Sequence, residues 1–225
     1  MKRSILIAFD KMGDSLSTLN AQFAYRLMNL CVKSEPVSLL SVNAVIEGEC
    51  LRIEECAQVS KDDDYTFKVF PNYEGDIPAL SQAILKEHPE FKLEIKSEDI
   101  DSIDDEGNPT VEKVPYILLT MPEVDDERYD VLKDGVKVLY DEAKVRMDAA
   151  ITNADAKFAT LAVGESEDDA MKLKEARDKQ VKTWTEQRDK LYEDKLKEIE
   201  EAHDKWLSKQ SEERLKHIQE ISNKH

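Results

Sequence analysis

Glycine and proline are scarce in this chain, with six glycines and seven prolines among 225 residues. Neither occurs from Glu165 to His225, so no strong helix breaker interrupts that stretch. All the prolines lie between Pro36 and Pro122. The scarcity predicts long helices on either side of a middle section of different texture.

Several other features are missing. No stretch approaches the roughly 20 apolar residues that span a bilayer, and the apolar start is too short for a secretory signal. Cys31, Cys50 and Cys56 form no CxxC pair, so reduced thiols and a cytoplasmic location are expected. We expect no membrane partner and no DNA partner.

Recognisable catalytic motifs are also absent. The four histidines do not form HxxxH or HExxH, and neither GxGxxG nor GxxxxGK[ST] occurs. Carboxylate pairs carry no information in so acidic a chain. The sequence therefore predicts a protein that is not an enzyme, with no catalytic residues, no metal and no cofactor.

Charge is abundant and unbalanced. Charged residues make up 36% of the chain, 49 acidic against 32 basic, which gives a formal net charge of −17, and the hydrophobic fraction is only 40%. This composition is typical of long helices that expose one polar face to solvent, rather than of a domain with a large hydrophobic core. A phosphate-binding surface would need a local excess of Lys and Arg against this acidic field.

Apolar residues at steps of three and four predict two long helices. The first stripe is Leu6, Phe9, Met12, Leu16, Leu19, Phe23, Leu27 and Leu30, and Pro36 ends it. The second is Leu132, Val136, Leu139, Ala143, Met147, Ala150, Ala154, Phe158 and Leu161. Asp125 is the expected N-cap of the second helix, Gly164 breaks it, and Ser166 is the expected N-cap of a third. Trp184 is assigned to the inner stripe of that third helix.

The middle section mixes strands and a helix. Residues 37–46 are rich in β-branched residues and are followed by a turn at Gly48, while 65–70 and 114–121 have the pattern of strands. Within residues 77–87 the apolar residues recur at helical spacing. Phe91, Leu93 and Ile95 alternate with polar residues, as in a strand. The acidic run at 98–106 is predicted to be a solvated loop.

The fold class predicted is α+β: a long three-helix bundle with an inserted small β/α/β domain. Residues 1–33 with 123–200 form the bundle, 34–122 the insert, and 201–225 a helical C-terminal extension. Within the bundle, Leu139, Ala143 and Phe158 are expected to be buried. The chain crosses between the two parts twice, so Lys33, Pro36 and Pro122 are predicted to form the hinge.

Taken in order, several segments resemble ribosome recycling factors. The stretch from Met121 to Arg128, a Pro turn before an acidic pair and an Arg, is similar to the family's strand-to-helix junction. Residues 141–146 and 166–169 look like parts of its second and third helices, and Lys11-Met12 with Leu16 and Leu19 resembles its first. Ser38-Leu39-Leu40, Gly48, Ala57 and Phe67-Lys68-Val69 follow its inserted domain.

The resemblance implies a tRNA-mimicking translation protein without enzymatic activity. Such a factor binds the large ribosomal subunit after termination and helps to split the subunits with a translocase GTPase. Its partners would then be rRNA or a ribosomal protein, and the GTPase.

The likeness weakens where rRNA contacts should lie. The positions that correspond to arginines on the outer face of the family's second helix are Asp148, Ile151 and Thr152, and Asp148 and Ile151 are expected to lie off the buried stripe. Arg128, Lys137 and Lys144 remain basic and are the candidate rRNA-binding residues. An Asp in place of a phosphate-facing Arg replaces attraction by repulsion.

Two functions therefore remain open. One is a divergent recycling factor; the alternative is a repurposed paralogue that acts as a protein-interaction module, with an unidentified protein partner and no rRNA docking. Trp206, Leu207, Ile218 and Ile221 give the extension a partly apolar face, so it is predicted to bind a partner or to self-associate. A frayed, solvated helix is the other possibility for this tail.

Overall fold

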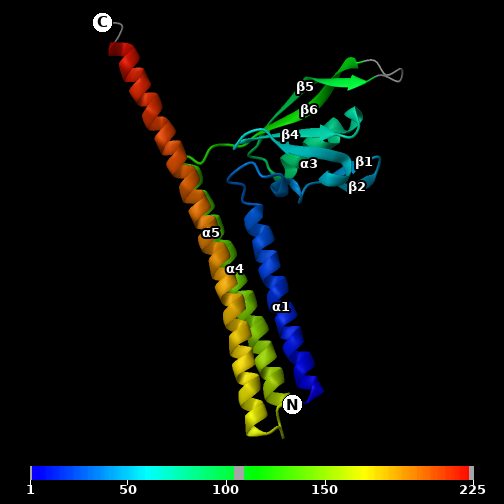
Figure 1. The fold of residues 1–225 in the computed structure, drawn as a ribbon, viewed down its shortest axis with the longest axis vertical. Helices are drawn as coiled ribbons and strands as arrows, with labels where there is room; N and C mark the ends of the chain where they lie inside the picture. The colour runs from blue at the N-terminus through cyan, green and yellow to red at the C-terminus, as the bar shows by residue number, and fades with distance from the viewer. Residues whose placement is uncertain (1, 104–108, 223–225) are drawn as a thin grey trace. The chain divides into compact units, whose positions relative to one another are not determined.

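The structure, a computed structural model, describes residues 2–103 and 109–222 (Figure 1). The chain divides into two compact units, one formed by Met1–Leu30 with Asp126–Lys205 and one by Cys31–Asp125 with Trp206–His225. We call them the bundle unit and the inserted unit. No helix in the described ranges is both long and apolar enough to cross a membrane.

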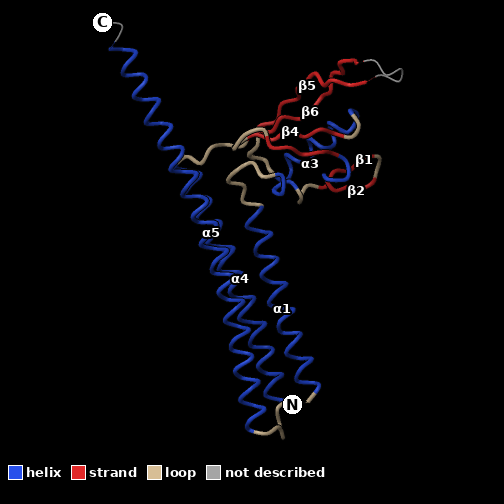
Figure 2. Tube along the Cα trace, viewed as in Figure 1, coloured by secondary structure: helices blue, strands red, loops and turns tan. Residues whose placement is uncertain are grey.

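Three long helices supply the bundle unit: α1 (Arg3–Met28), α4 (Asp126–Leu161) and α5 (Glu167–Ser222), which continues past Lys205 (Figure 2). The bundle and its inserted α/β section confirm the predicted fold class. The break between α4 and α5 falls as predicted: Gly164 has a positive φ of 80°, and the Ser166 hydroxyl accepts a hydrogen bond from the Asp169 amide at 3.2 Å. The predicted end of the first helix was wrong: α1 ends at Met28, before Leu30 and Pro36.

The bundle core is a narrow stripe on each helix. One buried cluster of this core contains Ile5, Met12, Leu16, Met147, Ala154, Phe158 and Leu173, with Trp184 partly buried against them. The predicted start of the α1 stripe was wrong: Leu6 is 50% exposed, and Ile5 is buried instead. One residue is a turn of about 100° on a helix, enough to move a side chain from the core to solvent. Ala143 and Phe158 are buried as predicted, whereas Leu139 is only partly buried.

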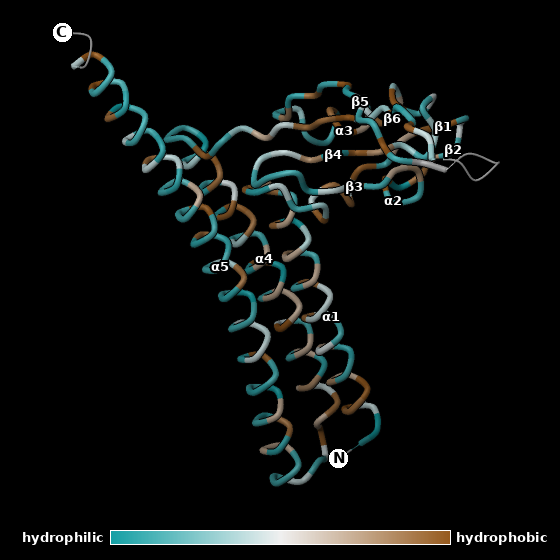
Figure 3. The backbone as a smooth tube through the Cα atoms, turned by 45° about the horizontal axis from the view of Figure 1, so that its top comes forward, coloured by the Kyte–Doolittle hydropathy of each residue, from teal (hydrophilic) through white to brown (hydrophobic). Residues whose placement is uncertain are grey.

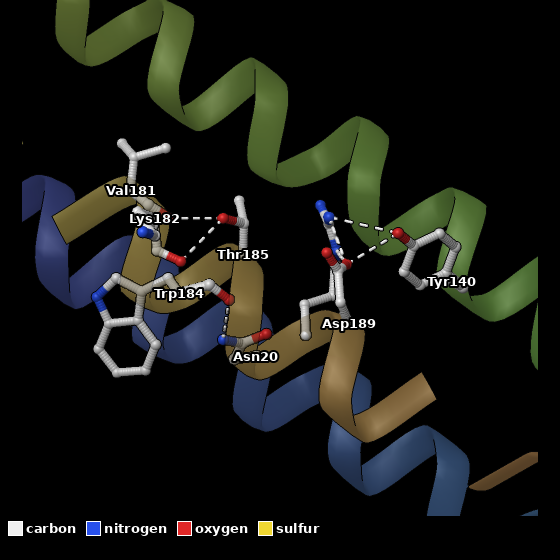
Figure 4. Close-up of polar contacts among 8 residues, drawn as sticks. Asn20, Tyr140, Val181, Lys182, Trp184, Thr185 and Asp189 are labelled. Carbon is white, nitrogen blue, oxygen red and sulfur yellow. Dashed lines mark hydrogen bonds and ion pairs between the residues drawn. The ribbon is translucent and has the colours of Figure 1, made fainter. Parts of the chain in front are cut away.

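Polar contacts join the helices between these apolar layers (Figure 4). The Asn20 amide on α1 donates to the backbone carbonyl of Trp184 on α5 at 2.9 Å. On the α4 side, the Tyr140 hydroxyl donates to Asp189 Oδ1 at 2.8 Å, and the buried Arg188 guanidinium donates to the same oxygen at 2.6 Å. Burial of the ring and the bond to Asp189 raise the pKa of Tyr140.

Two further contacts link α5 to the other two helices. Gly13 lies where α1 meets α5, and a Cβ at this position would collide with the Gln180 side-chain amide. Arg177 on α5 makes a two-pronged ion pair with Asp155 on α4, at 2.9 and 2.5 Å. α1 continues through Gly13, whose missing side chain leaves room for Gln180.

The inserted unit contains two antiparallel sheets. The larger has strand order β3-β4-β6-β5, from β3 (Ala57–Lys61), β4 (Thr66–Pro71), β6 (Pro109–Thr120) and β5 (Lys92–Ile103). The smaller pairs β1 (Asn43–Ile46) with β2 (Glu49–Arg52) through Glu47 and Gly48, both at positive φ. Short helical segments η1 (Pro36–Leu39), α2 (Ile53–Cys56) and η2 (Glu74–Asp76) complete it with α3 (Ile77–Glu87).

Period-two alternation builds the core of this unit. Phe67 and Val69 of β4 face the same side as Ile117 and Leu119 of β6, because Phe67 pairs with Leu119 and Val69 with Ile117. Leu80 and Ile84 of α3 belong to the same buried cluster. The apolar positions appear brown along the sheet and α3 in Figure 3. The bounds of α3 coincide with the predicted helix.

The solvated loop predicted for the acidic run at 98–106 was wrong for residues 98–103, which lie in β5. β5 continues through Ile103 and pairs with β6 in register, with Asp99 opposite Lys113 and Asp101 opposite Val111. Residues 104–106 lie outside the described residues. β4 pairs with β6 only from Ile117 onward, so beyond that point β5 and β6 form a two-stranded ribbon. Because both faces of such a ribbon meet water, acidic residues fit it and the hydrophobic pattern gives no strand signal.

We expect Leu16→Ala to destabilise the bundle by about 2–5 kcal/mol, because Leu16 is fully buried and its truncation leaves a cavity. Leu139→Ala should cost clearly less, since that side chain is only partly buried. Urea unfolding followed by Trp184 fluorescence, with Trp206→Phe as the common background, measures both. Equal losses for the two variants would contradict the burial pattern.

Candidate functional site

The three candidate cations on α4 do not share one face. Lys137 and Lys144 are seven residues apart and both exposed, so they point about 20° apart around the helix. Arg128 is nine residues before Lys137, on about the opposite side, and is partly buried. The predicted patch is therefore reduced to Lys137 and Lys144, and neither makes a side-chain ion pair within 4.0 Å in the described chain.

Carboxylates surround these two lysines. Asp134 and Asp141 lie three and four residues from Lys137, and Asp148 lies four residues from Lys144. All three aspartates are exposed. A phosphate held by the lysines would therefore sit within the field of nearby negative charges, which weakens the contact.

The positions that correspond to the family's arginines differ from one another. Asp148 and Thr152 are exposed, and the Thr152 hydroxyl donates to the Asp148 carbonyl at 2.8 Å. Ile151 is partly buried and packs against the bundle core. The prediction that Ile151 lies off the buried stripe was therefore wrong, and a charge there would be forced against apolar neighbours.

The first crossing segment is anchored inside the inserted unit. Cys31, Val32 and Ser34 are buried, and the Ser34 amide donates to the Asp64 carbonyl at 2.9 Å. Lys33 is partly exposed and Pro36 begins η1. The division between the units falls between Leu30 and Cys31 and between Asp125 and Asp126, so all three predicted hinge residues, Pro122 included, lie within the inserted unit.

The buried side chain of His88 makes polar contacts with this crossing segment. The buried ring has Nε2 at 3.2 Å from the Ser38 carbonyl, Nδ1 at 3.8 Å from Cys31 Sγ and 3.5 Å from a Glu90 carboxylate oxygen, and it stacks on Phe91. Burial disfavours the charged ring, but the contacts with Cys31 and Glu90 outweigh burial and raise its pKa to about 10. His88 was assigned no role from the sequence, because its partners are far along the chain.

The tail is helical through Ser222. Leu207, Ile218 and Ile221 are exposed, as is Leu215, which sequence analysis did not single out. Trp206 is partly buried, and Lys209 forms an ion pair with Glu123 within the inserted unit. The exposed apolar side chains therefore begin at Leu207.

Surface hollows are shallow and carry no metal-ligand set. One in the bundle unit is about 680 Å³ and lies between α1 and α4, lined by Ala8, Met12, Ala150, Ala154 and polar neighbours. Another, of about 630 Å³, lies in the inserted unit beside Glu47, Leu51 and Tyr73. Among the described residues, no three His, Cys, Asp or Glu side chains come together in a metal-binding arrangement.

The fold defines the class of protein: a helical-bundle protein with an α/β unit inserted after its first helix. A family model described as ribosome recycling factor matches residues 31–199. The chain therefore belongs to the ribosome recycling factor family, which consists of non-enzymatic translation factors. No curated protein matches the chain.

Solved structures share the fold. A solution structure of ribosome recycling factor is 19% identical, with a TM-score of 0.67, over 89% of this chain and 100% of that one. A model of the T. thermophilus factor, bound with E. coli elongation factor G to the E. coli post-termination complex, is 18% identical with a TM-score of 0.54. That match covers 87% of this chain and 98% of that one.

The raised pKa of His88 predicts a pH-dependent stability. Protonated His88 favours the folded state, because its pKa is about 10 there and about 6.5 in the unfolded chain. Its contribution is complete below pH ~6.5 and is lost as the pH rises towards 10. We expect His88→Gln to flatten the decline of unfolding free energy between about pH 7 and pH 9.5. The exposed-tail variant His217→Gln should keep the decline; an unchanged slope in His88→Gln would contradict the assignment.

Proposed function

We propose that this protein acts in the cytoplasm as a ribosome recycling factor, binding the ribosome after termination and helping to separate the subunits with a translocase GTPase. The family match over residues 31–199 carries the proposal. It covers the inserted unit up to Asp125, the whole of α4 and α5 up to Ile199. The similar T. thermophilus factor has been placed on a post-termination complex with elongation factor G.

In this proposal the bundle unit docks on the large subunit. Lys137 and Lys144 supply the phosphate contacts, and Arg128 contributes from another side of α4 or not at all. Motion at the two crossings, between Leu30 and Cys31 and between Asp125 and Asp126, would let the inserted unit change position, with Lys33, Pro36 and Pro122 on its side of the hinge. Because few cations act within an acidic surface, the rRNA contact should be weak, with a salt dependence set by only about two phosphate contacts.

A repurposed copy of the fold, acting as a protein-interaction module, is the second candidate. The observation that favours it is the acidic outer face of α4, where Asp148 stands at a position that the family resemblance assigns to Arg. A carboxylate there opposes phosphate and favours a basic protein surface. Ribosome binding and its salt dependence distinguish the two candidates.

The tail offers a second contact, and we propose that it self-associates. Between Trp206 and Ser222 it carries Lys209, Arg214 and Lys216 against Glu212, Glu213 and Glu220, so its formal charge is 3 − 3 = 0 in a chain of −17. Two tails can approach each other without the repulsion that the rest of the surface creates. Their exposed apolar side chains would form the contact.

The first prediction from this proposal concerns salt. Sedimentation with purified ribosomes at a series of salt concentrations should give a binding slope that Lys137→Gln with Lys144→Gln reduces by roughly 1.4–1.8, about 0.7–0.9 for each lost phosphate contact. Asp148→Arg with Thr152→Arg should tighten binding, because both positions are exposed. Matched controls on α5 are Lys179→Gln with Lys190→Gln, and Glu193→Arg with Thr183→Arg.

The outcomes separate the candidates. If wild type fails to sediment even at low salt while Asp148→Arg with Thr152→Arg succeeds, rRNA docking is lost and the protein-interaction module is the better description. Binding that resists high salt means that the contact is mainly with protein, and Lys137 and Lys144 are then not the docking residues.

The second prediction concerns the tail. Deleting residues 210–225 removes Leu215, Ile218 and Ile221 but spares the buried Ala202 and the ion pair of Lys209. Light scattering should show a concentration-dependent rise in mass for the full chain and none for the deletion or for Ile218→Lys. Ser211→Lys is the charge-matched control. A monomeric full chain at high concentration would leave the tail a solvated helix.

A further inference from the structure

The solvent side of α4 carries a regular pattern that the bundle does not use. Val131, Val138 and Val145 are seven residues apart and are 65%, 56% and 68% exposed. Each is followed three residues later by an exposed aspartate, Asp134, Asp141 and Asp148. We call these six residues the valine–aspartate ridge.

Helical geometry places the ridge away from the core. At about 100° per residue, the three valines lie within about 40° of one another and roughly opposite the buried side chains of α4. Those buried side chains are Leu132, Val136, Ala143, Met147, Ala154 and Phe158. From Val131 to Val145 the ridge runs about 21 Å along the helix. Bundle packing therefore does not account for the valines.

Exposed valines are costly on a solvated helix. A β-branched side chain loses rotamer freedom against the preceding turn, and in water it gains no burial in return. The chain places charged residues at 36% of its positions, yet it has valine at three ridge positions in heptad spacing. Such spacing is what a second helix meets when it lies along the first.

The charges of the ridge are not satisfied within the fold. In the described part of the chain, no side-chain ion pair or hydrogen bond involves the carboxylates of Asp134, Asp141 or Asp148. Lys137 and Lys144 border the ridge on one side. The exposed Arg146 lies on the other side. With the exposed Glu127 and Asp130, the local balance is five carboxylates against three cations, a net charge of −2.

We propose that the valine–aspartate ridge binds an amphipathic helix of a partner protein, with apolar residues in heptad spacing flanked by Lys or Arg. The apolar residues would cover the valines at intervals of about 10.5 Å, and the cations would pair with the aspartates. Nucleic acid fits poorly, because valine offers it no hydrogen bond and the carboxylates repel phosphate. A second copy fits poorly as well, because two ridges face to face would bring aspartates together.

The inference goes beyond both candidate functions and depends on neither. A ribosomal protein could supply the basic helix to a recycling factor, and another protein could supply it to an interaction module. Ribosome sedimentation tests the proposed function, whereas binding of an isolated peptide tests the ridge, so either can fail alone.

The test uses the full-length chain and a labelled synthetic helical peptide with Leu and Val at the core positions of three heptads and Lys at the flanking positions. Fluorescence anisotropy at about 0.15 M salt, where surface charges are screened beyond ~8 Å, gives the dissociation constant. The ridge variants are Val131→Ala with Val138→Ala and Val145→Ala, and Asp134→Lys with Asp141→Lys and Asp148→Lys. Each triple should weaken binding at least tenfold.

Controls separate the ridge from general acidity. Glu175→Lys with Glu193→Lys and Asp194→Lys makes the same charge change on exposed positions of α5 and should weaken binding no more than about threefold. A scrambled peptide of equal composition should bind at least tenfold less tightly. Circular dichroism checks that each variant keeps its helices, and the alanine triple should fold at least as well as wild type.

Four results would overturn the proposal. Unchanged affinity in the alanine triple would mean that the peptide responds only to negative charge. Equal weakening by the α5 control would mean the same. An RNA hairpin that still displaces the peptide from the chain with Lys137→Gln and Lys144→Gln, or a dimer that the ridge variants abolish in light scattering, would assign the face to a different occupant.

Discussion

Burial of one narrow apolar stripe on each of three long helices is the constraint on which the bundle depends. Leu16, Met147 and Phe158 meet in that stripe, while most of the surface of each helix stays wet. A chain with only 40% hydrophobic residues can form a core this thin, because each helix contributes one side chain per turn or fewer. Polar contacts such as Asn20 to Trp184 and Arg177 to Asp155 then set which helix faces which.

The wet faces are consequently free to carry the net charge of −17. On α4 this freedom is visible as an arrangement of side chains that no core requirement explains, with exposed valines between aspartates. The same helix therefore has two different kinds of constraint. Its inner face is limited by packing, and its outer face by whatever the protein binds.

Periodicity predicted the elements that have one buried face. The helix at residues 77–87, the break at Gly164 and the cap at Ser166 all follow local rules that act within a few residues. The predictions were wrong where the local structure depends on residues that are far away in the sequence. The acidic residues of β5 are in a strand because β6 pairs with them, and their own side chains indicate nothing of the kind.

The candidate site shows the same division. Sequence identified Lys137 and Lys144 as exposed cations, but grouping Arg128 with them ignored the rotation of the helix between residues 128 and 137. Ile151 was misplaced because a residue at the edge of a stripe can turn either way, and only the packing of the neighbouring helices decides. His88 could not be found at all, since Cys31 and Ser38 reach it from a segment about fifty residues earlier.

The extent of the family match follows from these constraints. The family model begins at residue 31 and so leaves out α1, yet the fold match with a recycling factor covers 89% of the chain. A helix that must supply only a stripe can change most of its other residues while it keeps its place in the bundle. The fold of this chain is accordingly shared with a recycling factor at only 19% identity. Binding partners of this chain have to be inferred from its own exposed residues, above all from those on the outer face of α4.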